Sequence, residues 1–440
     1  MRTTDELIAI SQRLIELTGM RGIKSAQVSA SSRRKQQISL DKNDYQIGVS
    51  SDNSRIQLVI HNDYRLGSAV TNDLSERGLE DVVEGAIALS ATSPRDEKLA
   101  LSRPGKVTKI HLKDEAIAAL DPAGLTGLAR DVFNPVLADK EMRVDGGALD
   151  ANQVALCIVN TNGVCVHEEA AYLTAYMSGF GVRGDQITSF DGDWIGTRRL
   201  NNYLDKAQAM LSELTSSIKS TFNPRKGESY KGMIIIRPEA VSRMLLSVVG
   251  FHSHGDALKD NASKWADKLG QAVASSLITL KDDPHNADYI QAGSFDGQGT
   301  PTKPATLIDR GVLQFFMESV DSASRRGAEP TGNENGLIVS RIPGGEGNIA
   351  DLAHQAGRPV LALRRFSGNL NTITGDFSGV AKNSHLLNDG ESIPLMETMI
   401  AGNVFDLLNN IVAIGKSANY RGIMETGPIL VDGVSVSVGG

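Results

Sequence analysis

Residues 154–168 read VALCIVNTNGVCVHE, and this stretch decides the fold of the first half of the chain. Apolar residues dominate Val154–Asn160 and alternate with polar residues in Val164–Glu168. Asn162-Gly163 lies between the two runs, and both residue types tolerate the positive φ angles of a tight turn. The stretch therefore predicts two antiparallel strands joined by a type I′ turn.

Alternating and helical patterns extend outward from this hairpin. Short alternating runs predict an antiparallel meander of three strands: Arg34–Leu40, Tyr45–Ser50 and Arg55–Ile60. Thr3 and Glu6 have the spacing of a capping box, which predicts a first helix that ends near Gly19. Apolar residues at helical spacing predict three more helices, over Leu79–Leu89, Ala116–Ala138 and Asn202–Lys219.

A polar, turn-rich segment, Asn223–Gly227, divides the chain. The second half is rich in glycine, asparagine and short apolar runs, which predicts mostly β structure. We expect strands at Met233–Ile236 and Leu277–Leu280, a closing hairpin at Ile429–Val438 around Asp432-Gly433, and helices at Ala240–Val249, Ser263–Ser275 and Asn403–Ile411. The predicted fold class is α+β, with an N-terminal α+β domain over residues 1–222 and a β-rich C-terminal domain over residues 223–440.

Composition narrows the class of protein. The chain has 440 residues, enough for about two or three domains of roughly 150 residues each. Its formal net charge of −7 argues against binding nucleic acid through the phosphates. No apolar run approaches the ~18–20 residues of a membrane span, and the acidic start is unlike a signal peptide. We therefore expect a cytoplasmic protein without nucleic-acid or membrane partners.

Motif by motif, the sequence shows no self-contained catalytic site. Gly179–Gly184 matches G-x-G-x-x-G, but a helical pattern does not follow it, which favours a strand end over a dinucleotide site. The chain lacks H-E-x-x-H and G-x-S-x-G motifs. His252 and His254 are the one close histidine pair, and Asp282-Asp283 is either a carboxylate pair or a turn after a strand.

Several stretches in the second half resemble one known family. The most specific are Thr374–Gly379 (TGDFSG), Asp389-Gly390-Glu391 and Thr398–Asn403 (TMIAGN). Phe295–Gly299 (FDGQG) and Thr331-Gly332-Asn333 also fit. In order and spacing they closely resemble the TldD/PmbA family, whose members are also described as modulators of DNA gyrase. The family often has two acids at the third and fourth positions of the FDGQG stretch, where this chain has Gly297 and Gln298.

The resemblance separates two branches of that family. TldD-like proteins carry H-E-x-x-x-H and a distant cysteine, which together bind zinc, whereas TldE-like (PmbA) proteins lack these ligands. An ungapped register places the two zinc-binding histidines at Leu246 and Phe251, and the general-base glutamate at Ser247. The chain has no cysteine after Cys165. It therefore resembles the TldE branch, and we expect no catalytic residue and no zinc in this chain.

Four residues remain as candidates for a site. His252 and His254 are candidate metal ligands, although the sequence favours polar loop histidines. Asp376 and Asn403 are candidate substrate-binding residues, although the sequence favours a turn or cap role for both.

The resemblance also implies a function and partners. It implies a non-catalytic subunit of a cytoplasmic zinc metallopeptidase that degrades or processes small unfolded peptides. Zinc is then expected on the TldD-like partner, and a homodimer is plausible in isolation. Two alternatives stay open at this stage. One is a gyrase- or toxin-related modulator without a peptidase role, and the other is a stand-alone hydrolase that uses His252, His254 or Asp282.

Overall fold

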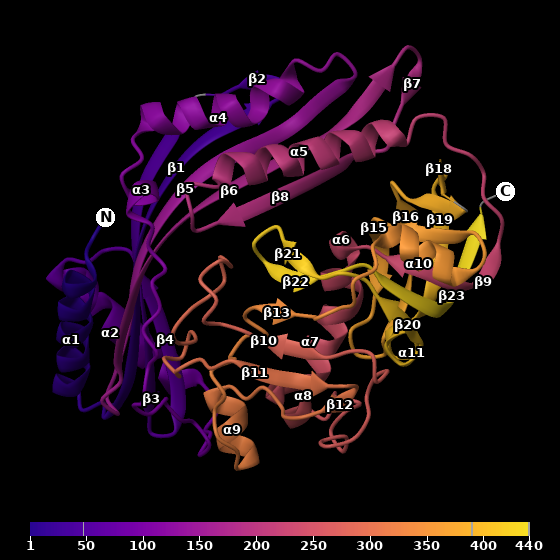
Figure 1. Ribbon diagram of the computed structural model, residues 1–440. Coiled ribbons are helices and arrows are strands. Elements are labelled where there is room, and N and C mark those ends of the chain that lie inside the picture. Colours follow the sequence, from indigo (N-terminus) through magenta and orange to yellow (C-terminus); the bar gives the residue numbers. More distant parts are fainter. Residues whose placement is uncertain (47, 389, 439–440) are drawn as a thin grey trace.

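The computed structural model describes residues 1–46, 48–388 and 390–438 (Figure 1). Ile47, which belongs to the predicted strand Tyr45–Ser50, lies outside the described residues, and so does Asp389 of the Asp389-Gly390-Glu391 motif. The chain is of mixed α and β structure. Among the described residues, the strands of the first half form one large sheet, and those of the second half form two others.

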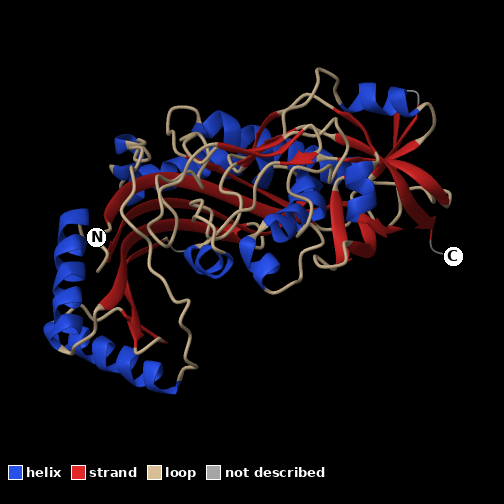
Figure 2. Cartoon of the chain, turned by 90° about the horizontal axis from the view of Figure 1, so that it is seen from below, coloured by secondary structure: helices blue, strands red, loops and turns tan. Residues whose placement is uncertain are grey.

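The N-terminal sheet has eight strands in the order β4-β3-β1-β5-β6-β7, and β2 pairs with β1 and β8 with β6. Its pairings are antiparallel. The strands are β1 (Ser25–Asp41), β2 (Asp44–Tyr45), β3 (Val49–Asn62), β4 (Arg65–Thr71), β5 (Met142–Asn160), β6 (Cys165–Arg183), β7 (Gln186–Ile187) and β8 (Asp191–Thr197). Four of them are long, and Figure 2 shows how strongly they curve.

The predicted hairpin is the β5–β6 connection. Val159 pairs with Cys165, and the Asn160 N–H donates to the Val164 carbonyl at 3.0 Å. Gly163 alone in the turn has a positive φ, of +92°. The turn is therefore a three-residue loop that ends in a left-handed glycine, not the two-residue type I′ turn that we expected.

Five helices of the first half pack on one face of this sheet. They are α1 (Thr4–Met20), α2 (Glu76–Thr92), α3 (Glu115–Ala118), α4 (Pro122–Leu137) and α5 (Tyr203–Ser220). Even-numbered residues of β1 share that face, because side chains alternate along a strand. Ala26 and Val28 lie in the core under α1 and α2, whereas Ile38 and Leu40 lie in the core with α3, α4 and α5. Figure 1 shows these two helical groups at opposite ends of the long strands.

Two further expectations for the first half are wrong in detail. The helix predicted over Ala116–Ala138 is divided into α3 and α4, because Asp121 caps a new helix and Pro122 occupies its first turn. The predicted meander of three short strands is in fact a pairing of the long β1 with the long β3, and β5 occupies the other side of β1. The sequence Gly179–Arg183 is the end of β6, as expected for a strand end.

The second half contains a six-stranded and a nine-stranded sheet. The first has the order β12-β11-β10-β13-β22-β21, from β10 (Leu280–Asp282), β11 (Ala305–Asp309), β12 (Val312–Leu313), β13 (Ser340–Arg341), β21 (Ala418–Tyr420) and β22 (Met424–Thr426). The second has the order β15-β16-β19-β23-β9-β14-β17-β18, and β20 pairs with β23. Its strands are β9 (Tyr230–Ile236), β14 (Val360–Leu363), β15 (Arg365–Leu370), β16 (Asp376–Lys382), β17 (His385–Asn388), β18 (Glu391–Pro394), β19 (Thr398–Asn403), β20 (Ile411–Ile414) and β23 (Ile429–Val438).

The closing hairpin predicted at Ile429–Val438 is a single strand, β23. Both of its ends pair with β9, and the register shifts between Val431 and Val434. Gly433 has a φ of +92° there, and the Asp432 N–H donates to the Asn410 carbonyl. The Asp432-Gly433 pair therefore produces a β-bulge, which keeps the strand between two neighbours instead of reversing it.

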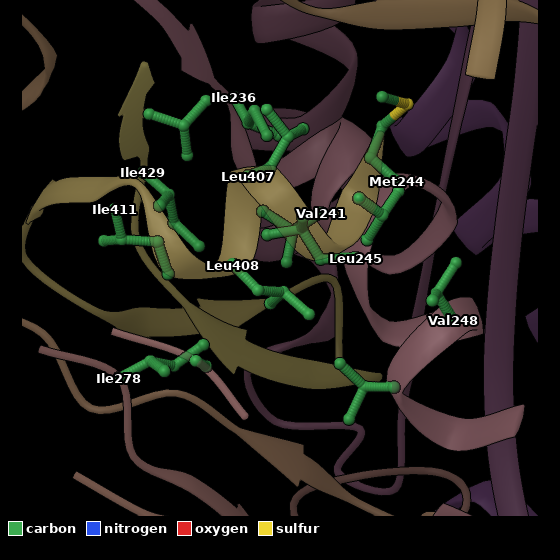
Figure 3. Close-up of a cluster of buried hydrophobic side chains, with 14 of the residues drawn as sticks. Ile236, Val241, Met244, Leu245, Val248, Ile278, Leu407, Leu408, Ile411 and Ile429 are labelled. Atoms are coloured by element: carbon green, nitrogen blue, oxygen red, sulfur yellow. The ribbon is translucent and has the colours of Figure 1, made fainter. Parts of the chain in front are cut away.

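Short helical segments cover the sheets of the second half. They are α6 (Pro238–Val241), the π-helical turn η1 (Ser242–Leu246), α7 (Ser247–Ser253), α8 (Gly255–Lys259), α9 (Val320–Arg326), α10 (Ile349–Ala356) and α11 (Val404–Asn409). The first three form one continuous helical stretch. Its apolar side chains recur at helical spacing and point into the largest hydrophobic core (Figure 3). There Val241, Met244, Leu245 and Val248 share one cluster with Leu407 and Leu408 of α11.

The helix predicted at Ser263–Ser275 is absent, and turns replace it. Its backbone N–H groups donate to other segments instead of to the preceding turn: Gly270 to Leu313, Val273 to Gly311 and Ser275 to Leu408. Gly270 also has a φ of +73°, which no right-handed helix contains. The strand expected at Leu277–Leu280 begins only at Leu280.

Buried ion pairs join the two halves. Arg364 donates from Nε to Asp191 at 2.8 Å and pairs with Glu239, and its side chain is 3% exposed. Arg365 also pairs with Asp191, at 2.6 Å, and Arg421 pairs with Asp193 on β8, at 2.9 Å. Three arginines of the second half thus form ion pairs with β8, a strand of the first half.

Candidate functional site

A groove of about 620 Å³ opens beside the helical stretch that follows β9. Its walls come from η1, α7, α8 and the loop that precedes β13. The lining mixes apolar and acidic side chains, and it includes Leu246, Ser247, Phe251, His254, Asp256, Asp260, Glu334 and Leu337. A groove of this size, with convergent polar groups on an apolar wall, is suited to a small ligand or a short peptide segment.

The three residues that we aligned with the zinc-binding pattern all line this groove. Leu246 ends the π-helical turn, and Ser247 and Phe251 lie in α7. Leucine and phenylalanine side chains carry no metal-binding atom, and the Ser247 hydroxyl donates to the Arg243 carbonyl at 2.8 Å. Local π-helical turns are common at functional sites, and this one lies directly before Ser247.

His252, a candidate metal ligand, faces the core instead of the groove. It is fully buried between aromatic rings, with its ring centroid 4.9 Å from that of Phe405. Its Nδ1 accepts the Lys264 N–H at 2.9 Å, and its Nε2 lies 2.9 Å from the Thr372 carbonyl, to which it donates. Burial lowers the pKa of His252. A neutral ring with both nitrogens engaged has no lone pair to offer to a metal ion.

His254 lines the groove, but its ring is also engaged. Its Nδ1 accepts the Asp256 N–H at 3.3 Å, which caps α8, and its Nε2 donates to the Glu334 carbonyl at 2.8 Å. The two histidines therefore do not point to one centre. Within residues 1–46, 48–388 and 390–438, no group of three or more His, Cys, Asp or Glu side chains is arranged to hold a metal ion.

Glu334 is the groove residue that the sequence reasoning missed. Its N–H donates to Asp296 at 3.3 Å and its carbonyl accepts from His254, so its backbone is fixed on both sides. Burial and the nearby carboxylates of Asp296 and Asp256 raise the pKa of Glu334 to about 7. Two stretches noted in the sequence could have indicated this loop. Thr331-Gly332-Asn333 directly precedes Glu334, and Asp296 of the FDGQG stretch accepts the Glu334 N–H.

Asp282 and Asp283, considered above as a carboxylate pair, have separate structural partners. Asp282 is 1% exposed and accepts from Asn333 Nδ2 at 2.7 Å and from the N–H groups of Ile338 and Val339. Burial raises the pKa of Asp282 to about 6. Asp283 pairs with Arg341 at 2.8 Å. Asp282 therefore holds the loop that carries Glu334 and does not face the groove.

Asp376 and Asn403 pair across β16 and β19, away from this groove. Asn403 Nδ2 donates to Asp376 Oδ1 at 2.8 Å and to the Thr374 carbonyl at 2.9 Å. Its Oδ1 accepts the Phe405 N–H and caps α11. The cap role is thus present, whereas a contact of Asp376 or Asn403 with substrate stays a prediction.

Comparisons with known proteins agree with this architecture. Residues 229–438 match the family model described as the PmbA/TldA metallopeptidase C-terminal domain. A Haemophilus influenzae protein named metalloprotease PmbA homolog is 24% identical over 390 residues, which cover 84% of this chain and 83% of that protein. Residues 229–438 therefore belong to the PmbA/TldD family, and this relative extends the similarity over most of the chain. Metalloprotease PmbA of Escherichia coli O157:H7 is 23% identical over 390 residues, covering 86% of this chain and 85% of the relative.

Solved structures share the PmbA/TldD fold of this chain. TldE from Thermococcus kodakarensis superposes with a TM-score of 0.86 at 22% identity, covering 97% of this chain and all of that one. A Thermotoga maritima protein proposed as a modulator of a DNA gyrase gives a TM-score of 0.86 at 20% identity, covering 98% of this chain and 99% of that one. The α+β fold class expected from the sequence is confirmed.

Among the helices of the described residues, none is long and apolar enough to cross a membrane.

Proposed function

We propose that this chain is a TldE-like, non-catalytic subunit of a cytoplasmic zinc metallopeptidase that degrades or processes small unfolded peptides. In this account a TldD-like partner holds the zinc ion and cuts the peptide. This chain contributes a wall of the substrate cavity. The names of the relatives, metalloprotease PmbA and its homolog, support membership in a peptidase system.

The observation that carries the proposal is the chemistry of the groove. The positions aligned with the zinc-binding residues are Leu246, Ser247 and Phe251, and all three line the groove. The nearby histidines, His252 and His254, have both ring nitrogens engaged by backbone groups. A zinc peptidase centre at this groove would need a set of metal ligands, and the described residues group no three His, Cys, Asp or Glu side chains there. The same engagement of His252 and His254 argues against a stand-alone hydrolase built on them.

The groove supports a peptide as the ligand class. Its volume lies within the roughly 300–1,000 Å³ of typical ligand sites, and it opens beside short helices and loops. An extended segment fits such a space, whereas a folded protein does not. On its own, the chain is expected to pair with a second copy, because a surface that binds a related fold is often self-complementary.

Reconstitution tests the proposal. The purified chain, a TldD-like subunit and their equimolar mixture are incubated with an unfolded peptide such as reduced, alkylated insulin B chain, and cleavage is followed by mass spectrometry. We expect cleavage by the mixture and none by this chain alone, with chelation of zinc by phenanthroline abolishing it. Cleavage by this chain alone, or a mixture no more active than the TldD-like subunit alone, would contradict the proposal.

A further inference from the structure

Among the described residues, Glu334 is the one partly buried acid of the groove whose carboxylate has no hydrogen-bond or ion-pair partner. The other acids nearby are already engaged or exposed to water. Asp256 pairs with Lys259 at 3.3 Å, and Asp296 accepts the N–H groups of Gln298, Thr300 and Glu334. Asp260 is exposed at the rim. The unpaired carboxylate is thus a single, defined acceptor.

The backbone of Glu334 holds this carboxylate in place. Its N–H is fixed by Asp296 and its carbonyl by His254. The carboxylate lies against Gly297, since a Cβ added at Gly297 would clash with Glu334 Oε2. Gly297 and Glu334 together line a second pocket of about 260 Å³, so Glu334 lies between that pocket and the groove. The glycine at this position therefore leaves the space that the carboxylate occupies.

The surroundings of Glu334 favour a cation over an anion. Asp296 and Asp256 both act on it as like charges, and Lys259 of α8 is bound to Asp256 at 3.3 Å and to Asp321 at 3.0 Å. A partly buried carboxylate among carboxylates is costly unless a positive group pairs with it. A metal ion is the less suitable cation, since the described residues group no three ligands there.

The apolar part of the groove lining indicates which kind of cation fits beside Glu334. Leu246, Phe251 and Leu337 provide apolar contact beside the acid. A primary ammonium group carried on a short peptide fits both features, because its N–H groups can donate to the carboxylate while a neighbouring side chain packs on the apolar wall.

We propose that Glu334 binds the primary ammonium group of a peptide lying in this groove. This inference rests on the proposed function for the nature of the ligand, and it adds a specific anchor. Two sources can supply the ammonium group, the amino terminus of the peptide or a lysine side chain, and both present the same three N–H donors to the carboxylate.

Three peptides measure the interaction with the full-length chain by isothermal titration calorimetry at pH 7.5. The first is alanyl-leucyl-alaninamide, with a free amino terminus. The second is its N-acetyl form, which has no ammonium group. The third is N-acetyl-alanyl-lysyl-alaninamide, which offers only the lysine ammonium. We expect the first peptide to bind about tenfold more tightly than the second, the usual effect of one charge-assisted hydrogen bond. The third shows whether lysine also serves.

Variants assign the effect to Glu334. Glu334→Gln keeps the shape and removes the charge, so the free and acetylated peptides should bind equally weakly. Gly297→Ala keeps the charge but displaces the carboxylate, and should reduce the preference as well. Asp260→Asn is the matched control, since it removes the same charge from the rim of the groove and should keep the preference.

The inference is overturned if the free and acetylated peptides bind the wild-type chain with equal affinity. It is also overturned if neither peptide binds at millimolar concentration, or if Glu334→Gln still prefers the free peptide. These outcomes are independent of the proposed function, because zinc content and cleavage with a TldD-like partner are measured in other experiments. If the chain supports cleavage with its partner but binds the free and acetylated peptides equally, only the proposed role of Glu334 is refuted.

Discussion

Replacing Arg364 with methionine should strongly destabilise the junction between the two halves. The Arg364 side chain is 3% exposed and contacts Asp191, which is 2% exposed, and Glu239, which is 14% exposed. Asp193 lies 4.0 Å away and is 6% exposed. The substitution keeps most of the apolar stem but leaves these carboxylates with one cation fewer in a site from which water is largely excluded.

The size of the effect follows from the burial and from the remaining cations. Removing one member of a buried ion pair costs roughly 3–5 kcal/mol. Arg365, Arg421 and Arg237 still pair with Asp191, Asp193 and Glu239, so we expect the lower end, about 3 kcal/mol. That loss corresponds to more than about a hundredfold change in the unfolding equilibrium.

The loss should also depend on pH. Burial already raises the pKa of Asp193, and removing Arg364 removes an attraction that lowers it. Carboxyl groups whose folded-state pKa lies above the unfolded value stabilise the protein at low pH, and this contribution is lost as pH rises. The variant should therefore be closer to wild type at pH 5 than at pH 8.

Urea unfolding followed by tryptophan fluorescence measures this prediction, since Trp194 is next to Asp193 in β8. Arg77→Met is the matched control, because Arg77 is 90% exposed and lies 3.9 Å from Asp81, and such surface pairs contribute at most about 1 kcal/mol. A loss below about 1 kcal/mol for Arg364→Met, or equal losses at pH 5 and pH 8, would refute the reasoning.

Three further predictions concern the site and its supports. Asn403→Ala removes the cap of α11 at the Phe405 N–H, and thermal unfolding should show a loss of about 1–2 kcal/mol; an unchanged midpoint would contradict the cap role. Asp282→Ala leaves the Val339 N–H and two other donors without their acceptor, so we expect the free energy of unfolding measured in urea to fall by about 3 kcal/mol or more. A change near zero would show that water replaces the carboxylate. Glu334 has a folded-state pKa of about 7, above the unfolded value, so its protonated carboxyl stabilises the fold at low pH, and this contribution is lost as pH rises to about 7. Glu334→Gln should therefore be more stable than wild type at pH 8, and the difference should shrink toward pH 5. A difference that does not depend on pH would exclude the raised pKa.

Local signals in the sequence predicted the elements that depend on local chemistry. The glycine at 163 allowed the turn between β5 and β6, and the Thr3 capping box begins α1 as expected. The spacing of apolar residues after Pro238 predicted a helix, and the structure has a continuous helical stretch there. In these cases the residues that decide the conformation are neighbours in the sequence.

Elements that depend on distant partners could not be predicted in this way. Residues 263–275 have helical spacing, yet their N–H groups bond to Leu313, Gly311 and Leu408. The Asp432-Gly433 pair is typical of a turn, but β9 pairs with β23 on both sides of it, and β20 and β19 pair with the two ends of β23. A single sequence does not show which strand will lie alongside.

The same limit applied to the site. The positions Leu246, Ser247 and Phe251 were assigned from a family resemblance, and the groove that they line became visible only in three dimensions. Glu334 was missed because its environment is built from three segments that the sequence separates: helix α8 with Asp256, the loop with Asp296, and the loop with Glu334 itself. The engagement of both nitrogens of His252 and His254 is likewise a tertiary property.

The metal content of the purified full-length chain tests the central claim most directly. Elemental analysis after mild dialysis, without any partner, should give zinc well below one atom per chain, because the groove offers no metal-binding set among the described residues. Zinc near one atom per chain would contradict the assignment to a non-catalytic subunit. Its disappearance in a His252→Ala, His254→Ala double variant would then identify this chain as an enzyme in its own right.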